Sequence, residues 1–177
     1  MRKGLALVTL VSLLAFGGMA LTAFAAEKGL SAAEKAFIKD AASSGDMEVE
    51  LGKVAQQKGT AQEVKDFGKK METDHSKAGE ELKALASQNN VEIPAQLERK
   101  HQMTVEKLSK YTGADFDKKY MADMVADHKK DVAKFKKESK KAKNPALKQW
   151  IDKTLPTLEQ HLQLAKDTAQ KVGVKMK

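Results

Sequence analysis

The amino-acid sequence predicts an all-α fold: a four-helix bundle made of two antiparallel hairpins joined by a long crossover that carries a short helix. The composition is the first indication, because helix-forming residues such as alanine, lysine and glutamate are abundant and only three prolines occur. Second, no segment alternates apolar and polar residues as a half-buried strand does. Third, helix start and stop signals delimit four long segments of about 30 residues, or roughly 40–45 Å each.

The first two long helices each begin at a capping box, in which glutamate follows a serine or threonine by three residues. Ser31 and Glu34 form one such box, and Thr60 and Glu63 form the other. Gly59, between the two boxes, ends the first helix and leaves a tight turn. The two predicted helices span residues 31–58 and 60–88.

The sequence NNVEIP then interrupts the helical pattern and begins the crossover. A short helix is predicted over residues 94–111, with Gly113 marking its end. The third long helix is predicted over residues 114–143. The crossover, about 25 residues in all, is long enough to run the length of a bundle built of such helices.

Asn144 and Pro145 begin the last helix, as an N-cap followed by proline at the first helical position. This helix is predicted to run to Gly173, with a bend at Pro156. Tight turns join the first to the second long helix and the third to the fourth, so each pair is an antiparallel hairpin. Two hairpins joined by a long crossover have the connectivity of ferritin-like bundles.

A secretory signal peptide precedes the helices. Arg2 and Lys3 lead into an apolar run from Leu5 to Leu21, and a small-residue cleavage site ends at Ala25. The predicted organisation is a signal peptide, residues 1–25, and a helical bundle domain, residues 26–177.

The signal peptide predicts a periplasmic or secreted protein. The sequence contains no cysteine, which excludes disulfides and lipid attachment to a cysteine at the cleavage site. No later segment is apolar for long enough to cross a bilayer, so no transmembrane segment is expected in the mature chain. Removal of the two basic residues of the signal peptide lowers the formal net charge from +8 to +6.

The remaining lysines are scattered among acidic residues, which is typical of solvated helix faces and does not predict nucleic-acid binding. The sequence shows no paired nucleophile and base and no glycine-rich phosphate loop, so no catalytic residue is assigned and a non-enzyme is favoured. The sequence leaves the identity of a protein partner and assembly into a homo-oligomer open.

The chain has four histidines, and two of them occur in the repeated pattern Met-x-x-Asp-His, as METDH and MVADH. On a helix of 100° per residue, His75 and His128 fall on the apolar stripes of their helices, with His161 toward the edge of its stripe. Glu48 falls in the middle of the stripe of the first helix. All four residues lie near the middle of their helices, so we expect them to occupy one layer of the core.

Three neutral imidazoles and a carboxylate are a plausible ligand set for Zn, Fe, Cu or Mn. Glu48, His75, His128 and His161 are therefore the candidate metal ligands, and the identity of the metal is left open. The alternative is a purely structural layer, in which Glu48 accepts hydrogen bonds from the histidines and fixes the register of the bundle.

The residues near the candidate ligands are expected to form ion pairs or to pack in the core. His101 is expected to be structural in the short helix. Asp74 and Asp127, which point beside the apolar stripes, are expected to form ion pairs with lysines three residues later, Lys77 and Lys130. The methionines that precede His75 and His128 by one turn suit Cu(I), but methionine at helical spacing is usually core filler.

Four segments carry a resemblance to a known family: SGDMEVELGKVA, VKDFGKKMETDHSKAGEELKALA, GADFDKKYMADMVADHKKDVAKF and TLPTLEQHLQLAK. With these segments the chain resembles the bacterial predicted periplasmic or outer-membrane proteins called domain of unknown function family 4142. The resemblance implies a ferritin-like bundle and export, and it implies no established activity. Ferritin-like di-iron proteins carry Glu-x-x-His on two helices; here only Glu72 to His75 matches, whereas Val125 and Leu158 take the Glu position before His128 and His161. This departure favours a mononuclear, histidine-rich site.

The leading hypothesis is an exported bundle that binds a transition metal in its core, for metal binding or stress protection. The alternative is a non-catalytic interaction or structural module of the bacterial envelope with a buried Glu/His layer. A redox enzyme with a dinuclear centre is the least favoured hypothesis, because it needs a carboxylate bridge and a second Glu-x-x-His.

Overall fold

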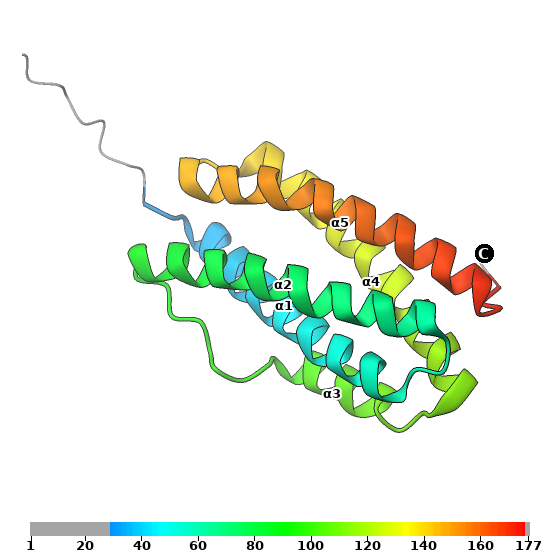
Figure 1. Ribbon diagram of the computed structural model, residues 1–177. Coiled ribbons are helices and arrows are strands. Elements are labelled where there is room, and N and C mark those ends of the chain that lie inside the picture. The colour runs from blue at the N-terminus through cyan, green and yellow to red at the C-terminus, as the bar shows by residue number, and fades with distance from the viewer. Residues whose placement is uncertain (1–28, 176–177) are drawn as a thin grey trace, which may run out of the picture.

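Four long helices and one short helix make up the part of the chain that the computed structural model describes, residues 29–175 (Figure 1). This part contains no strand, so the predicted all-α fold is confirmed. The predicted signal peptide, with its cleavage site, lies outside the described residues. None of the described helices is long and apolar enough to span a membrane. The helices are α1 Ala32–Lys58, α2 Gln62–Gln88, α3 Arg99–Leu108, α4 Gly113–Lys141 and α5 Pro145–Lys171.

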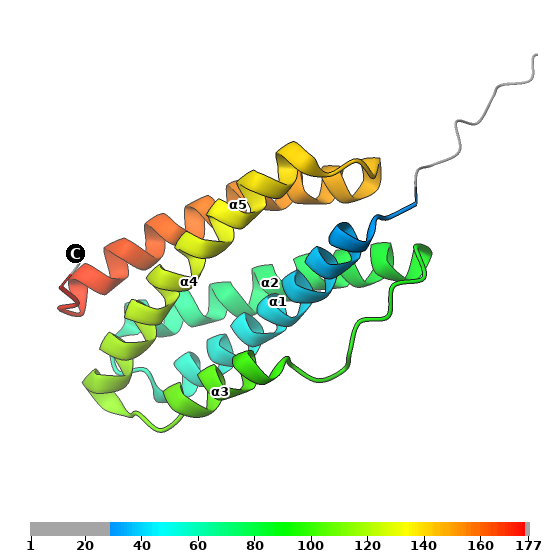
Figure 2. The ribbon, with the colours of Figure 1, turned by 180° about the vertical axis from the view of Figure 1, so that it is seen from behind.

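The helices form two antiparallel hairpins, α1 with α2 and α4 with α5 (Figure 1). From the end of α2 the crossover returns along α1, and α3 lies beside α1 before α4 begins (Figure 2). Because of this return, α2 and α4 run in the same direction, as expected for hairpins joined by a long crossover. Between the hairpins, α2 packs on α5 and α1 on α4.

Two predicted helix starts are wrong. The capping box of Thr60 with Glu63 does not form: α2 begins at Gln62, and its N-cap residue, Ala61, makes no side-chain cap. The predicted short helix over residues 94–111 is confined to Arg99–Leu108. The later start of α3 has a physical reason. Extended chain covers about 3.3 Å per residue and helix only about 1.5 Å, so an extended segment crosses the same distance with fewer residues. The residues between α2 and α3 return part of the way along the bundle before α3 begins (Figure 2).

The turn of each hairpin is held by a carboxylate of the other hairpin. In α1, Glu34 completes the predicted capping box with Ser31. Its second oxygen accepts hydrogen bonds from the amides of Lys143 and Asn144, at 2.8 and 2.9 Å, in the α4–α5 turn. In α4, the carboxylate of Asp117 accepts from the amides in the α1–α2 turn, those of Thr60 (3.0 Å) and Ala61 (2.9 Å). These reciprocal bonds fix the longitudinal position of each hairpin against the other.

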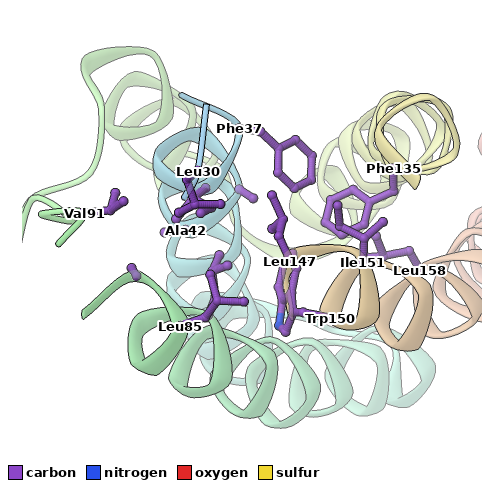
Figure 3. Close-up of a cluster of buried hydrophobic side chains, with 14 of the residues drawn as sticks. Leu30, Phe37, Ala42, Leu85, Val91, Phe135, Leu147, Trp150, Ile151 and Leu158 are labelled. Carbon is purple, nitrogen blue, oxygen red and sulfur yellow. The ribbon is translucent and has the colours of Figure 1, made fainter. Parts of the chain in front are cut away.

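The hydrophobic core is divided into two clusters along the bundle axis. Figure 3 shows the first cluster, where Phe37 of α1 meets Phe135 of α4 with ring centroids 5.2 Å apart. In the same cluster Trp150 of α5 donates from Nε1 to the Ala78 carbonyl of α2 at 3.2 Å. The second cluster lies at the opposite end and includes Phe116 and Tyr120, whose rings are stacked. Each long helix contributes to both clusters, and the candidate site lies where each helix passes from one to the other.

Two glycines allow α1 and α2 to approach closely. A Cβ added at Gly68 of α2 would lie 2.7 Å from the Ala55 Cβ and 2.7 Å from the Gly52 carbonyl oxygen of α1. Such distances are shorter than side-chain contacts permit, so the crossing of the two helices requires glycine here.

This crossing predicts opposite effects for two glycine substitutions in the same helix. Gly68→Ala should destabilise the protein by about 1–3 kcal/mol through overpacking. Gly79→Ala, where the nearest atom is 3.9 Å away, should stabilise it by about 0.5–1 kcal/mol because alanine is the better helix former. Urea unfolding of both variants measures the difference, and a gain in stability for Gly68→Ala would contradict the close crossing.

From the lowered pKa of the Glu34 carboxylate we expect the protein to lose stability in acid. Burial alone would raise its pKa, but hydrogen bonds from the Asn144 amide, from Ser31 and from the Lys143 amide together lower the pKa from 4.5 to about 2. Because the folded-state pKa is depressed, this contribution is complete above pH 4.5 and is lost as the pH falls toward 2. Glu34→Gln should therefore lower the free energy of unfolding at pH 7 by about 2 kcal/mol.

Unfolding followed from pH 7 to pH 2 measures this effect. The difference between wild type and Glu34→Gln should shrink as the pH falls toward 2. Glu106→Gln, at an exposed position of α3, is the control and should follow the wild type at every pH. A Glu34→Gln difference that does not vary with pH would show that the charge of Glu34 is not what stabilises the turn.

Candidate metal centre

Three histidine side chains converge in the middle of the bundle, one each from α2, α4 and α5. His75, His128 and His161 each offer one ring nitrogen, and these atoms all lie within 4.8 Å of one another. The ring centroids are 5.4 Å apart for His75–His161 and His128–His161, and 5.8 Å apart for His75–His128. Three of the four predicted ligands are thus brought together at one point.

The hydrogen bonds of two of these rings determine which nitrogen is free. Nδ1 of His128 lies 3.0 Å from the Met124 carbonyl oxygen. Since a carbonyl can only accept, Nδ1 carries the proton and Nε2 has the lone pair. In His161 the arrangement is reversed, because Nε2 lies 2.8 Å from a carboxylate oxygen of Asp74 and Nδ1 is left with the lone pair.

Each of the three histidines leaves one buried nitrogen without a hydrogen-bond partner. These atoms are Nε2 of His75, Nε2 of His128 and Nδ1 of His161. His75 is partly exposed as a residue, although its Nε2 is buried. A histidine that ligates a metal usually donates its other ring N–H to a carboxylate or a backbone carbonyl, which fixes the ring. His128 and His161 both have this arrangement.

The surroundings keep the three rings neutral. Burial lowers the pKa of His75 well below 6.5, and the neighbouring His128 and His161 lower it further. Burial, together with His161, lowers the pKa of His128 to about 4. For His161 burial lowers the pKa although the hydrogen bond to Asp74 opposes the shift. Neutral imidazole is the form that binds a metal ion, so no proton has to be displaced at pH 7.

Asp74 is a site residue that the sequence analysis assigned wrongly. The expected ion pair with Lys77 does not form; Asp74 instead accepts from Lys70, one turn earlier, and from His161 of α5, both at 2.8 Å. Burial alone would raise the pKa of Asp74, but these two hydrogen bonds lower it. The sequence pattern that could have indicated this role of Asp74 is the Asp-His pair. Adjacent helical residues point about 100° apart, so His75 faces the centre while Asp74 faces α5.

The structure places Glu48 beside the group of three histidines and not within it. The side chain of Glu48 is fully buried in α1, and its Oε1 lies 3.8 Å from Nδ1 of His128. This nitrogen is the one bonded to Met124, whereas the nitrogen of His128 without a partner is Nε2. Burial raises the pKa of Glu48 well above 4.5, and the nearby carboxylates of Asp127 and Asp131 raise it further.

The expected ion pair of Asp127 with Lys130 is also wrong, since none forms within the described residues. Asp127 lies beside Glu48, and its Oδ2 is buried without a partner. In α3, His101 forms a hydrogen bond between its Nδ1 and the Ser43 hydroxyl of α1, at 2.7 Å. Both methionines of the repeated motif, Met71 and Met124, belong to the second hydrophobic cluster.

Comparison with known proteins identifies the family. A family described as "Domain of unknown function (DUF4142)" matches residues 19–168. The solved structure of CopM in the Cu(I)-bound form has a similar fold, with a TM-score of 0.65 over 77% of this chain and 95% of that chain. The two sequences are 16% identical, so this likeness concerns the fold alone. A search of curated proteins finds no significant sequence match. The chain therefore belongs to the DUF4142 family.

Proposed function

We propose that this protein binds a transition metal ion in the centre of its bundle, with His75, His128 and His161 as the ligands. Two observations carry the proposal: one ring nitrogen of each histidine lies within 4.8 Å of the others, and each ring has a buried nitrogen without a hydrogen-bond partner. Each buried unsatisfied polar atom costs about 1–3 kcal/mol. One cation satisfies all three at once.

The donor set favours metals that bind imidazole. Zn, Cu and Fe all accept neutral nitrogen ligands, whereas Mn binds such a site more weakly in the usual order of affinities. The fold shared with CopM, which has been solved with Cu(I), makes copper one of the ions to test. Glu48 lies beside Nδ1 of His128 and is not proposed to share the ion with the three imidazoles.

Binding or sequestration suits the site better than turnover. The hydrophobic clusters enclose it on both sides along the bundle axis. A cavity of about 30 Å³ beside the centre, which His75 lines but His128 and His161 do not, has room for a water molecule and not for an organic substrate. The proposed role is therefore to hold a metal ion, for protection against metal stress or for metal binding as such.

The proposed place of action is outside the cytoplasm, because the start of the chain has the features of a signal peptide cleaved after Ala25. The mature protein is then the helical bundle of residues 26–177. Sequencing of the N-terminus of the protein isolated from its host tests this directly, and Ala26 is the expected first residue.

The second candidate is an envelope interaction module in which the same layer is purely structural. Two hydrogen bonds that need no ion support it. The His161–Asp74 bond joins α5 to α2, and the His128–Met124 bond fixes the ring of His128. This candidate predicts that histidine substitutions change stability and leave metal content unaffected.

Metal analysis separates the two candidates. Protein purified without an affinity tag should contain or take up one metal ion per chain, and His128→Ala and His161→Ala should each abolish this binding. Saturation at 100 times the dissociation constant should stabilise the wild type by about 2.7 kcal/mol. Metal-free wild-type protein that gains no thermal stability from Zn, Cu, Fe or Mn would exclude the proposed function.

Asp74→Asn tests the role of the carboxylate that orients His161. Loss of such a partner typically lowers metal affinity by about 10–100-fold without removing a ligand. Competition with a chelator of known affinity measures the change. Asp66→Asn, at an exposed position of the same helix, should bind the metal as tightly as the wild type, and equal affinity in Asp74→Asn would contradict this role.

A further inference from the structure

The metal centre accounts for only part of the unsatisfied polar groups in the core. Within residues 29–175, the buried side-chain atoms that lack a hydrogen-bond partner belong to six residues, all near the middle of the bundle. Three of these residues are the histidines of the centre. The other three are Glu48, Asp127 and Tyr120. They form a second polar group, the oxygen group, beside His128.

The oxygen group contains a carboxylate without a counter-charge. Glu48 is fully buried, and neither of its oxygens has a hydrogen-bond partner. No lysine or arginine in the described part of the chain forms an ion pair with it. The nearest nitrogen is Nδ1 of His128 at 3.8 Å, whose proton is already directed at the Met124 carbonyl. A buried carboxylate in this situation is strongly destabilising unless a cation or a shared proton compensates it.

The neighbours of Glu48 supply further oxygen atoms. Asp127 of α4 lies beside Glu48, and in the absence of a cation a shared proton compensates the two carboxyl groups. A divalent cation that replaces this proton has oxygen atoms of both groups as donors. The Tyr120 hydroxyl is fully buried, lacks a partner and lies near enough to Glu48 to sense its charge. This hydroxyl is a non-acidic polar group that is left unsatisfied in the same part of the core.

Solvent reaches one member of the oxygen group, Asp127. A cavity of about 430 Å³ opens between α1, α3 and α4, and Asp127 and Asp131 are among its lining residues. Asp131 accepts a hydrogen bond from Ser44 at 3.4 Å. A cation that enters this cavity meets Asp131 and Asp127 before it reaches Glu48.

We propose a second cation site at the oxygen group, formed by Glu48 and Asp127 with the Tyr120 hydroxyl, and with Asp131 at its mouth. Its ligand is a divalent cation that prefers oxygen donors, of which Mn²⁺ is the representative. Two carboxylates balance the charge of such an ion. The two sites differ in chemistry, because the metal centre offers nitrogen donors and this site offers oxygen donors.

The test is a titration with Mn²⁺ alone, followed by electron paramagnetic resonance, which distinguishes free from bound Mn²⁺. The wild type should bind one Mn²⁺ per chain at this site, and Glu48→Gln and Asp127→Asn should each weaken binding at least tenfold. Asp123→Asn removes a carboxylate from the same cavity that is outside the oxygen group. This control should bind Mn²⁺ as the wild type does.

The His75→Ala/His161→Ala double variant distinguishes this site from the metal centre. It should retain Mn²⁺ binding, whereas Glu48→Gln should retain binding of Zn²⁺ by the histidines, so either proposal can fail without the other. Absence of Mn²⁺ binding in the wild type would overturn the proposal. Unchanged binding in the carboxylate variants, or its loss in the double histidine variant, would overturn it equally. Asp127→Asn, at a partly exposed position, decides the matter if Glu48→Gln does not fold.

Discussion

The structure depends on a layer of desolvated imidazoles and carboxylates that crosses the middle of the core. Each long helix contributes at least one of these groups, where it leaves one hydrophobic cluster and enters the other. Burial alone makes such a layer unfavourable, because its polar atoms lose their water and several have no hydrogen-bond partner in exchange. The two apolar clusters supply the stability that tolerates it. The layer is thus better explained by ligand binding than by stability.

The layer requires that the two hairpins meet at a fixed longitudinal position. A shift of one helical turn, 5.4 Å, would exceed the 4.8 Å within which the three ligand nitrogens lie. The reciprocal carboxylates at the ends of the bundle prevent such a shift, since Glu34 binds the amides of one turn and Asp117 those of the other. The close crossing at Gly52 and Gly68 fixes α1 against α2 in the same way. The ends of the bundle therefore determine the geometry of its middle.

Helical periodicity was sufficient to predict the layer, because a residue's angular position and its distance along a helix follow from its number. His75, His128, His161 and Glu48 were found in this way. Periodicity does not show which ring nitrogen is free or that Glu48 lies outside the group of three histidines, because both depend on tertiary contacts such as that of Asp74 with His161. Local rules assigned Asp74 to Lys77 and gave Thr60 a capping role. In the structure, Asp74 accepts from Lys70 and from the distant His161, and the amide of Thr60 donates to the distant Asp117.

X-ray absorption spectroscopy of the Zn²⁺-loaded protein tests the central claim most directly, because it reports the atoms bound to the ion. Three imidazole nitrogens at about 2.0–2.1 Å, with the multiple-scattering pattern of histidine rings, are the predicted result. The fourth position is free for a water molecule. A spectrum dominated by carboxylate oxygens, or one in which fewer than three imidazoles surround the ion, would contradict a metal centre built by His75, His128 and His161.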